Sequence, residues 1–238
     1  MTLFRLFIIS FAMCLITTSV SAQQPKKPAT TSAVKKTAPA ASKTTPAAKK
    51  TAPAQKAAPV VTKAKAVDLG LPSGTLWADR NVGAEAPDAY GGLFRYGNRG
   101  KGNGEGTPKV ENIIGTRYDV ARAQMGDHWC LPSAAQLEEL LKYCAFDYVT
   151  FKKVPGYIVT GPNGNEIFLP LTGCMYNYGR SQAGQFAMYA SGERAGYQMY
   201  VCGEIYCLAL WPPSNGYDNM LTVEGVGMGN PIRAVYVE

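Results

Sequence analysis

Residues 23–66 cannot contribute to a hydrophobic core, and this feature sets the first limit on what the chain can fold into. They comprise 13 Ala, 10 Lys, 7 Thr and 6 Pro, with no acidic residue, no aromatic residue and no glycine. The prolines recur often enough to interrupt every helix, and the lysines repel one another. The segment is therefore predicted to be a disordered, extended tether. Scattered lysines would give it only weak, non-specific attraction to anionic envelope polymers, so a spacer role is favoured.

The first 22 residues have the three-part pattern of a secretory signal peptide. Arg5 precedes a largely apolar stretch over 6–16, and Val20-Ser21-Ala22 ends the segment with small residues. The apolar stretch is too short for a membrane-spanning helix, which needs about 20 residues. We therefore expect cleavage after Ala22 and no transmembrane segment. Export would deliver the chain to the periplasm, the cell surface or the medium.

Residues 67–238 are the part of the chain with the composition of a folded domain. They hold all 25 glycines and 22 of the 25 aromatic residues. They also hold all 17 acidic residues but only 13 of the 24 basic ones, so their net charge is −4 although the whole chain carries +7. An acidic domain lacks the basic surface that nucleic acids require, so no specific nucleic-acid partner is expected.

Two helices are predicted in this domain. Ser133 is a suitable N-cap, and the apolar residues at 137, 140, 141 and 144 that follow it share one helical face. A shorter helix is predicted over 118–125, ended by Gly126. We expect a single core to which both helices and the strands contribute, containing Trp77, Trp129, Leu137, Leu140, Leu141 and Ile232.

Short antiparallel strands are predicted for most of the rest. Residues 67–71 and 75–81 flank a Pro-Ser-Gly turn, and residues 157–160 and 166–169 flank a second turn rich in Gly and Asn. A closing strand is predicted over 232–237. The fold class is therefore α+β, with two short helices, small antiparallel sheets and long loops.

A short internal repeat predicts a three-strand meander over 186–211. Met188-Tyr189 is followed by Gly192-Glu193, and eleven residues later Met199-Tyr200 is followed by Gly203-Glu204. Each Gly-Glu pair suits the centre of a two-residue turn. The second hairpin would then have one apolar face, formed by Tyr197, Met199, Val201, Tyr206, Leu208 and Leu210.

Four ordered blocks resemble the FISUMP family, the Fibrobacter succinogenes major paralogous domain. The blocks are VDLGLPSGTLWADRNVGA at 67–84, YDVARAQMGDHWCLPS at 118–133, GPNGNEIFLPLTG at 161–173 and the terminal IRAVYVE. The resemblance implies a C-type-lectin-like fold, related to that of formylglycine-generating enzymes. In that fold the N- and C-terminal strands pair, two helices flank a small sheet, and a long loop region carries function.

The chain departs from the family pattern at three places. Cys130 replaces the Arg of a Trp-Arg-Leu-Pro-Thr block, and Tyr96-Gly97-Asn98 replaces Trp-Gly-Glu. Residues 188–191 read Met-Tyr-Ala-Ser where the family has Tyr-Trp-Ser-Ser. These changes leave the predicted fold intact but put in doubt any function that those positions carry.

Five cysteines remain after cleavage, and two of them suggest a specific contact. A tight turn at Gly203-Glu204 would place Cys202 and Cys207 on adjacent strands, so they form a candidate disulfide. The same Cys-x4-Cys spacing occurs in the copper site of formylglycine-generating enzymes, which implies a copper oxidase as an alternative function. The residues between the two cysteines do not match that enzyme family, so no catalytic residue is predicted.

No metal or cofactor site is predicted elsewhere. His128 is the only histidine, which leaves no cluster for zinc and no Ser-His-Asp arrangement. The glycine-rich segment 97–106 lacks the Lys-Ser/Thr of a phosphate-binding loop. The calcium motifs of mannose-type lectins are also absent from the sequence.

The best candidates for ligand contact are aromatic and polar residues in two predicted loops. Flat rings beside amides and a carboxylate suit stacking on, and hydrogen bonding to, sugars or peptides. The competing interpretation is that the rings cover a small core and the polar residues form turns. The sequence therefore favours a non-catalytic binding module for an unknown glycan or protein ligand, with a structural envelope component as a further alternative. The candidate binding residues are Tyr176, Asn177, Tyr178, Arg180, Trp211, Asn215, Tyr217, Asp218 and Asn219.

Overall fold

The computed structural model describes residues 63–98, 107–176, 179–196 and 203–238. The predicted signal peptide and almost all of the predicted tether lie outside these residues. The described residues all belong to one unit, 57–238. Ala66, assigned above to the tether, is the first residue of a strand, and the neighbouring Lys65 N–H donates to Asp79 Oδ1.

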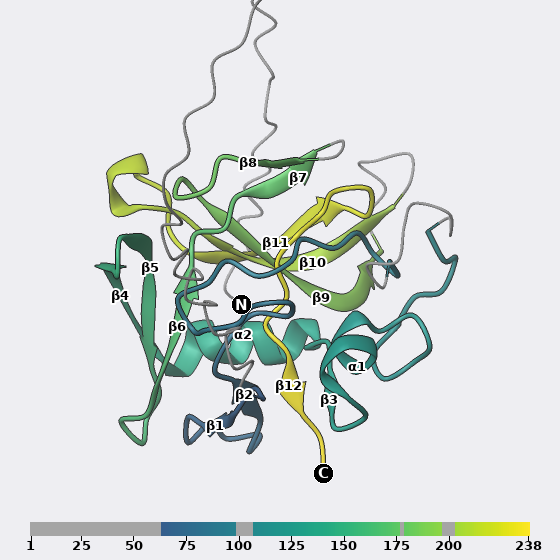
Figure 1. Cartoon of the computed structure of the whole chain (residues 1–238), viewed down its shortest axis with the longest axis horizontal. Coiled ribbons are helices and arrows are strands. Elements are labelled where there is room, and N and C mark those ends of the chain that lie inside the picture. Colours follow the sequence, from purple (N-terminus) through teal and green to yellow (C-terminus); the bar gives the residue numbers. More distant parts are fainter. Residues whose placement is uncertain (1–62, 99–106, 177–178, 197–202) are drawn as a thin grey trace, which may run out of the picture. The chain divides into compact units, whose positions relative to one another are not determined.

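A four-stranded sheet joins the two ends of this unit, and we call it the terminal sheet. It consists of β1 (Ala66–Asp68), β2 (Leu76–Ala78), β12 (Val235–Tyr236) and β3 (Trp129–Cys130), antiparallel in the order β1-β2-β12-β3 (Figure 1). The predicted turn between β1 and β2 is confirmed, because the Gly74 N–H donates to Leu71 O over 2.9 Å. Gly74 has φ +69°, a conformation that favours glycine. The predicted closing strand is also confirmed, although it is only two residues long.

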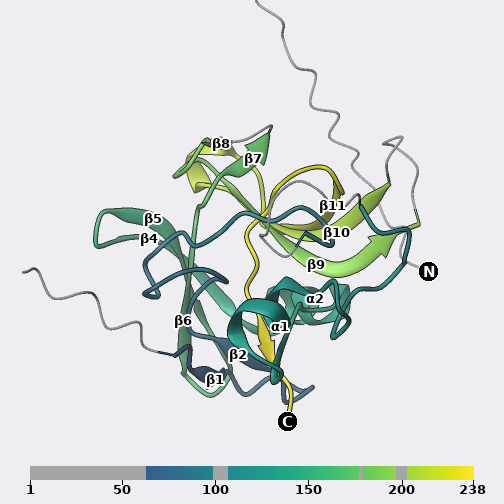
Figure 2. The ribbon, with the colours of Figure 1, turned by 45° about the vertical axis from the view of Figure 1, so that its right-hand side comes forward.

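Both predicted helices are present. Helix α1 (Val120–Met125) begins after the N-cap Asp119 and ends at Gly126. Helix α2 (Ala134–Tyr143) begins with a capping box, in which Ser133 and Gln136 each accept a hydrogen bond from the other's backbone N–H. Helix α2 lies between the terminal sheet and a sheet formed by β9 (Ala187–Ala195), β10 (Glu204–Leu210) and β11 (Met220–Gly225), and it buries Leu137 and Leu140 there (Figures 1 and 2).

A second sheet, which we call the outer sheet, contains one strand that the sequence does not predict. It comprises β4 (Ala145–Phe151), β5 (Val154–Thr160) and β6 (Glu166–Pro170), antiparallel in that order. The β5–β6 hairpin is the predicted one. Strand β4 follows α2 directly and pairs with β5 along its whole length through a two-residue turn at Lys152-Lys153.

The predicted meander is wrong at its first turn. Strand β9 (Ala187–Ala195) continues past Gly192-Glu193 without reversing direction. It pairs with β10 (Glu204–Leu210), which in turn pairs with β11 (Met220–Gly225). The register shifts between Ile205 and Cys207, so the Gly-Glu pair forms a bulge instead. Gly192 is needed there because a Cβ atom would lie 2.5 Å from the Ile114 side chain. The bulge also directs Glu193 Oε2 to the Ala134 N–H at the start of α2.

The second predicted turn is wrong as well. Glu204 pairs with Ala195 and Ile205 with Arg194, so Gly203-Glu204 is not the centre of a two-residue hairpin. Residues 197–202, which include the rest of this prediction, lie outside the described residues. Two smaller elements complete the described chain: the hairpin of β7 (Cys174–Tyr176) and β8 (Gly179–Ser181), and the 3-10 helix η1 (Pro213–Asn215).

The single predicted core is in fact two clusters on opposite faces of β10. Leu208 and Leu210 face the first cluster, which also contains Trp77, Leu137 and Leu140. Cys207 and Ile205 face the second, which contains Trp129 and Ile232. Leu208 and Leu210 share an apolar face of β10 as predicted, but the opposite face of this strand is buried as well.

Candidate functional site

Three aromatic rings form a partly exposed ladder beside the outer sheet. The ring centroids of Phe186 and Trp211 are 5.3 Å apart, and those of Trp211 and Tyr217 are 5.4 Å apart. Trp211 and Phe186 are half-buried, whereas Tyr217 keeps 44% of its surface exposed. We refer to Phe186, Trp211 and Tyr217 as the aromatic ladder. Its outer end is open to solvent and its inner end is fixed in the fold.

The backbone of Trp211 is held from both sides. Its N–H donates to Asn219 Oδ1 over 3.2 Å, and its carbonyl accepts a hydrogen bond from the Tyr157 hydroxyl of β5. Burial raises the pKa of Tyr157, so this hydroxyl keeps its proton at neutral pH. The chain then turns through η1 to Gly216, whose φ of +70° lets Tyr217 fold back toward the indole. The ladder is therefore preorganised by the outer sheet and by one side-chain amide.

Exposed polar groups adjoin the ladder. Asn215 and Asp218 are exposed on either side of Tyr217 in the chain, while Asn219 is half-buried and engaged with Trp211. Asn215 and Asp218 can therefore offer an amide and a carboxylate to a ligand, whereas Asn219 acts as a positioning residue. Among the predicted residues, the structure brings Trp211, Tyr217 and Asn219 together.

The other predicted loop has a different role. Tyr176 is 62% exposed on β7, but Asn177 and Tyr178 lie outside the described residues. Arg180 donates through Nη1 to Thr172 O over 2.7 Å and through Nη2 to Gly91 O. Its guanidinium also lies 5.3 Å from the centre of the Tyr90 ring. Arg180 thus fixes the loop around residue 91, and the prediction that it binds ligand receives no support from its contacts.

Phe186 links these two regions, although it was not among the predicted binding residues. Its carbonyl accepts a hydrogen bond from the Gly173 N–H, just before β7, over 2.7 Å, while its ring contacts that of Trp211 at an interplanar angle of 31°. The only signal in the sequence was an aromatic residue directly before the predicted strand at 186–211.

More aromatic side chains lie on the two faces of the outer sheet. The ring centroids of Tyr148 on β4 and Tyr157 on β5 are 5.5 Å apart, and those of Phe151 and Phe168 are separated by the same distance. Tyr148 and Phe151 remain 39% and 40% exposed. Tyr157 also holds Trp211, so the Tyr148–Tyr157 pair adjoins the ladder. Phe151 and Phe168 lie on the opposite face of the outer sheet, because side chains alternate along each strand.

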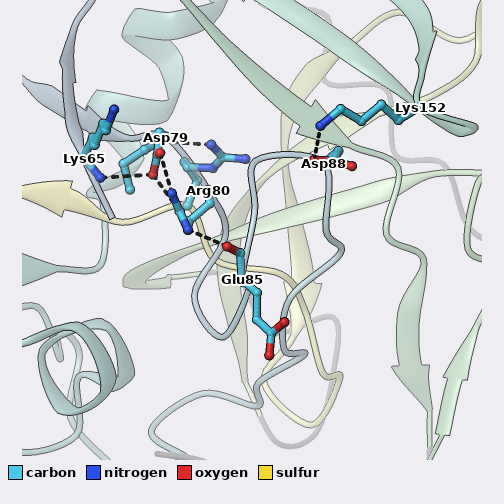
Figure 3. A network of polar contacts seen from close by, with 8 residues as sticks. Lys65, Asp79, Arg80, Glu85, Asp88 and Lys152 are labelled. Atoms are coloured by element: carbon cyan, nitrogen blue, oxygen red, sulfur yellow. Dashed lines mark hydrogen bonds and ion pairs between the residues drawn. The ribbon is translucent and has the colours of Figure 1, made fainter. Parts of the chain in front are cut away.

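A polar network fixes the loop that follows β2 (Figure 3). Asp79 accepts hydrogen bonds from Arg80 Nε and from the Lys65 N–H, and Arg80 Nη1 donates to Glu85 O over 2.6 Å. Burial alone would raise the pKa of Asp79, but Arg80 and these hydrogen bonds outweigh it and lower the pKa. Farther along the loop, Asp88 forms an ion pair with Lys152 at the tip of the β4–β5 hairpin. The network is structural and joins the terminal sheet to the outer sheet.

The remaining predicted groups contribute no reactive site. His128 is exposed and stacks on Tyr236, and its Nδ1 lies 3.2 Å from Val237 O. Cys207 has a free, fully buried thiol, and burial raises its pKa well above the ordinary value. Because Cys202 lies outside the described residues and the turn that would join it to Cys207 is not formed, the structure gives their disulfide no support. Within the described residues, no group of three or more His, Cys, Asp or Glu is arranged to hold a metal ion.

Comparisons with family models, with curated proteins and with solved structures found no match to this chain. The FISUMP resemblance therefore still rests on the four sequence blocks. In the part of the chain that the structure describes, no helix is both long enough and apolar enough to cross a membrane.

Proposed function

We propose that the domain is a non-catalytic binding module whose ligand stacks on the aromatic ladder. The observation that carries the proposal is the arrangement of Trp211 and Tyr217, two rings fixed in place with the outer one 44% exposed. Flat, preorganised rings bind the apolar faces of sugar rings or of peptide side chains without losing much conformational freedom. Asn215 and Asp218 would supply hydrogen bonds that orient the ligand.

The sequence resemblance supports the same class of function. We propose that the chain has a C-type-lectin-like fold of the FISUMP type, exported by its signal peptide and held off the envelope by the tether. The pairing of the N-terminal hairpin with the C-terminal strand and the two helices beside small sheets fit this relation. In such a fold a loop region carries the ligand, and here Trp211 and Tyr217 of the ladder lie on the segment between β10 and β11.

The oxidase alternative has weaker support. It needs two accessible thiolates, because thiolate is the form that binds Cu(I). Cys207 is fully buried, and burial holds its pKa well above the ordinary value. These properties favour a core thiol, so the binding module is the function we put forward.

The proposal is tested by binding to a panel of immobilised glycans and peptides, comparing the natural chain with Tyr217→Ala and Trp211→Ala. Loss of a stacking ring should weaken binding at least about tenfold, since one such contact contributes about 1 kcal/mol or more beyond its buried area. The matched control is Tyr143→Ala, which removes a ring of similar exposure, 42%, from the end of α2. Equal binding by all variants would contradict the proposal, and so would the absence of any bound glycan or peptide.

A further inference from the structure

Strand β4 forms an open edge of the outer sheet. Within the described residues, the sheet order is β4-β5-β6, and no strand pairs with the other side of β4. Figures 1 and 2 both place the β4–β5 hairpin at the outside of the fold. Five of its seven residues, among them Tyr148 and Phe151, are exposed, and none of the seven is fully buried.

Two observations establish which backbone groups point outward from this edge. A two-residue turn closes on a pair that exchanges both hydrogen bonds, here Phe151 and Val154. Residues alternate along the strand, so Thr150 opposite Pro155 belongs to a pair without such bonds. Pro155 agrees, because it has no N–H and its carbonyl accepts from Leu171 on the β6 side. The N–H and C=O groups of Phe146, Tyr148 and Thr150 therefore face away from β5.

This edge lacks the devices that keep strand edges from pairing. Such devices include short length, proline, lysine, bulges and covering segments. Strands β1 and β3 are three and two residues long, β9 carries the bulge, and β6 ends at Pro170. Strand β4 pairs with β5 over seven residues without a register shift. It contains no Pro, Gly or Lys, and Asp147 is its only charged residue.

We propose that β4 is the assembly edge at which a second copy of this chain adds, by antiparallel pairing of β4 with β4 about a two-fold axis at Tyr148. Three outward-facing residues are centred on Tyr148, so this register uses all of them. Phe146 pairs with Thr150 of the second copy, Tyr148 with its own counterpart, and Thr150 with Phe146, and each pair exchanges two backbone hydrogen bonds. The two outer sheets become one continuous sheet.

The side chains of β4 complement themselves in this register. Large residues meet small ones, because Phe151 lies opposite Ala145 and Phe146 opposite Thr150. Asp147 lies opposite Val149, so no charge directly faces its own kind. The Lys152-Lys153 turn of each copy falls opposite residues 143–144 of the other, at the C-terminal end of α2, where the helix dipole favours a cation and Lys142 already supplies one. Lys153 has no ion pair within the described residues that would compete for it.

The first test is the mass of the purified full chain, measured by sedimentation equilibrium from about 1 µM to about 1 mM, a range that spans weak to moderate affinities. We expect reversible dimerisation. Tyr148→Lys places two cations opposite each other on the axis and should raise the dissociation constant at least about tenfold. Tyr176→Lys, which introduces the same change at an exposed tyrosine of β7, should leave it unchanged.

The second test measures the protection of the β4 amides from hydrogen exchange. The amides of Phe146, Tyr148 and Thr150 should become protected only at high protein concentration, while those of Asp147, Val149 and Phe151 are protected at every concentration. Thr150→Pro removes one outward N–H and no bond to β5, so it should weaken the dimer while cooperative unfolding is retained. A monomer at all concentrations overturns the proposal, even if that monomer binds extended peptides along β4. A dimer without the alternating protection, or one indifferent to Tyr148→Lys, overturns it equally.

Discussion

No strand of the terminal sheet exceeds three residues, whereas the strands of the outer sheet have five to seven. The outer sheet is held by long, regular ladders of backbone hydrogen bonds, and its side chains remain partly exposed. The terminal sheet has few ladder bonds and relies on buried side chains that bond to the backbone. The two sheets are therefore stabilised in different ways, the outer one by backbone ladders and the terminal one by buried side chains.

Two buried ionisable residues, Arg233 and Asp119, form these side-chain hydrogen bonds to the backbone around the terminal sheet. Arg233 is fully buried and donates to Asn81 Oδ1, Ala78 O and Phe168 O at 3.0, 2.9 and 2.6 Å. It thereby connects the segment before β12 to the end of β2 and to β6. Asp119 accepts four backbone N–H groups, those of Gly115, Ala121, Arg122 and Leu131. Each replaces several ladder bonds that the short strands cannot form.

The largest effect should come from Arg233→Met. The change keeps much of the volume but leaves three buried acceptors without donors, so the free energy of unfolding should fall by about 4 kcal/mol. Urea denaturation followed by tryptophan fluorescence would measure it. Arg122→Met, at an arginine whose side chain is 42% exposed, is the control and should change stability by less than about 1 kcal/mol. Similar losses for both variants would show that Arg233 does not hold the sheets together.

Leu140→Ala should have the next largest effect. Leu140 is 1% exposed in the cluster between α2 and the strands, and its truncation should lower the free energy of unfolding by about 3 kcal/mol. Tyr143→Ala, one turn farther along the same helix and 42% exposed, should cost less than about 1 kcal/mol. A loss below about 1 kcal/mol for Leu140→Ala would mean that the buried face of α2 is assigned wrongly.

Asp119→Asn tests the second anchor more finely. Oδ2 accepts from both Gly115 and Leu131, and Oδ1 from Ala121 and Arg122, so an amide must present its NH2 group to one pair of donors. The free energy of unfolding should fall by about 2 kcal/mol. Asp127→Asn, which changes a nearby aspartate with an 82% exposed side chain, should have little effect. If the two variants unfold at the same urea concentration, Asp119 contributes no more than an ordinary surface residue.

The sequence predicted the parts of the fold whose signals are local. Ser133 and the apolar spacing that follows it predicted α2, and Pro72-Ser73-Gly74 predicted the first hairpin. Strand β4 has no such signal, because its turn consists of two lysines instead of Gly or Asn. The bulge at Gly192 was interpreted as a turn because its true cause is a distant contact, the close approach of Ile114.

The candidate site was predictable in composition but not in roles. Trp211 and Tyr217 were identified because they are aromatic residues in a predicted loop that also carries amides and a carboxylate. The packing of β7, β9 and β10 decides how exposed these rings are, that Asn219 supports them and that Phe186 joins them. No local sequence pattern predicts this packing. Arg180 was named for its charge, and only the structure shows that two backbone carbonyls already engage it.

The smallest effect we predict lies in the outer sheet, at the Lys152-Lys153 turn. Both residues have positive φ, +47° and +71°, which an L side chain adopts at a cost of about 1–2 kcal/mol. Lys153→Gly should relieve this strain and, after the greater entropy loss of glycine, raise the free energy of unfolding by up to about 1 kcal/mol. Lys152→Gly is the matched control, because it relieves similar strain but removes the ion pair with Asp88, so its gain should be smaller. If Lys153→Gly gains nothing, the long β4–β5 ladder does not carry strain at its tip. If it gains stability and at the same time weakens dimerisation, the lysine is retained for its contact with the second copy and not for the hairpin itself.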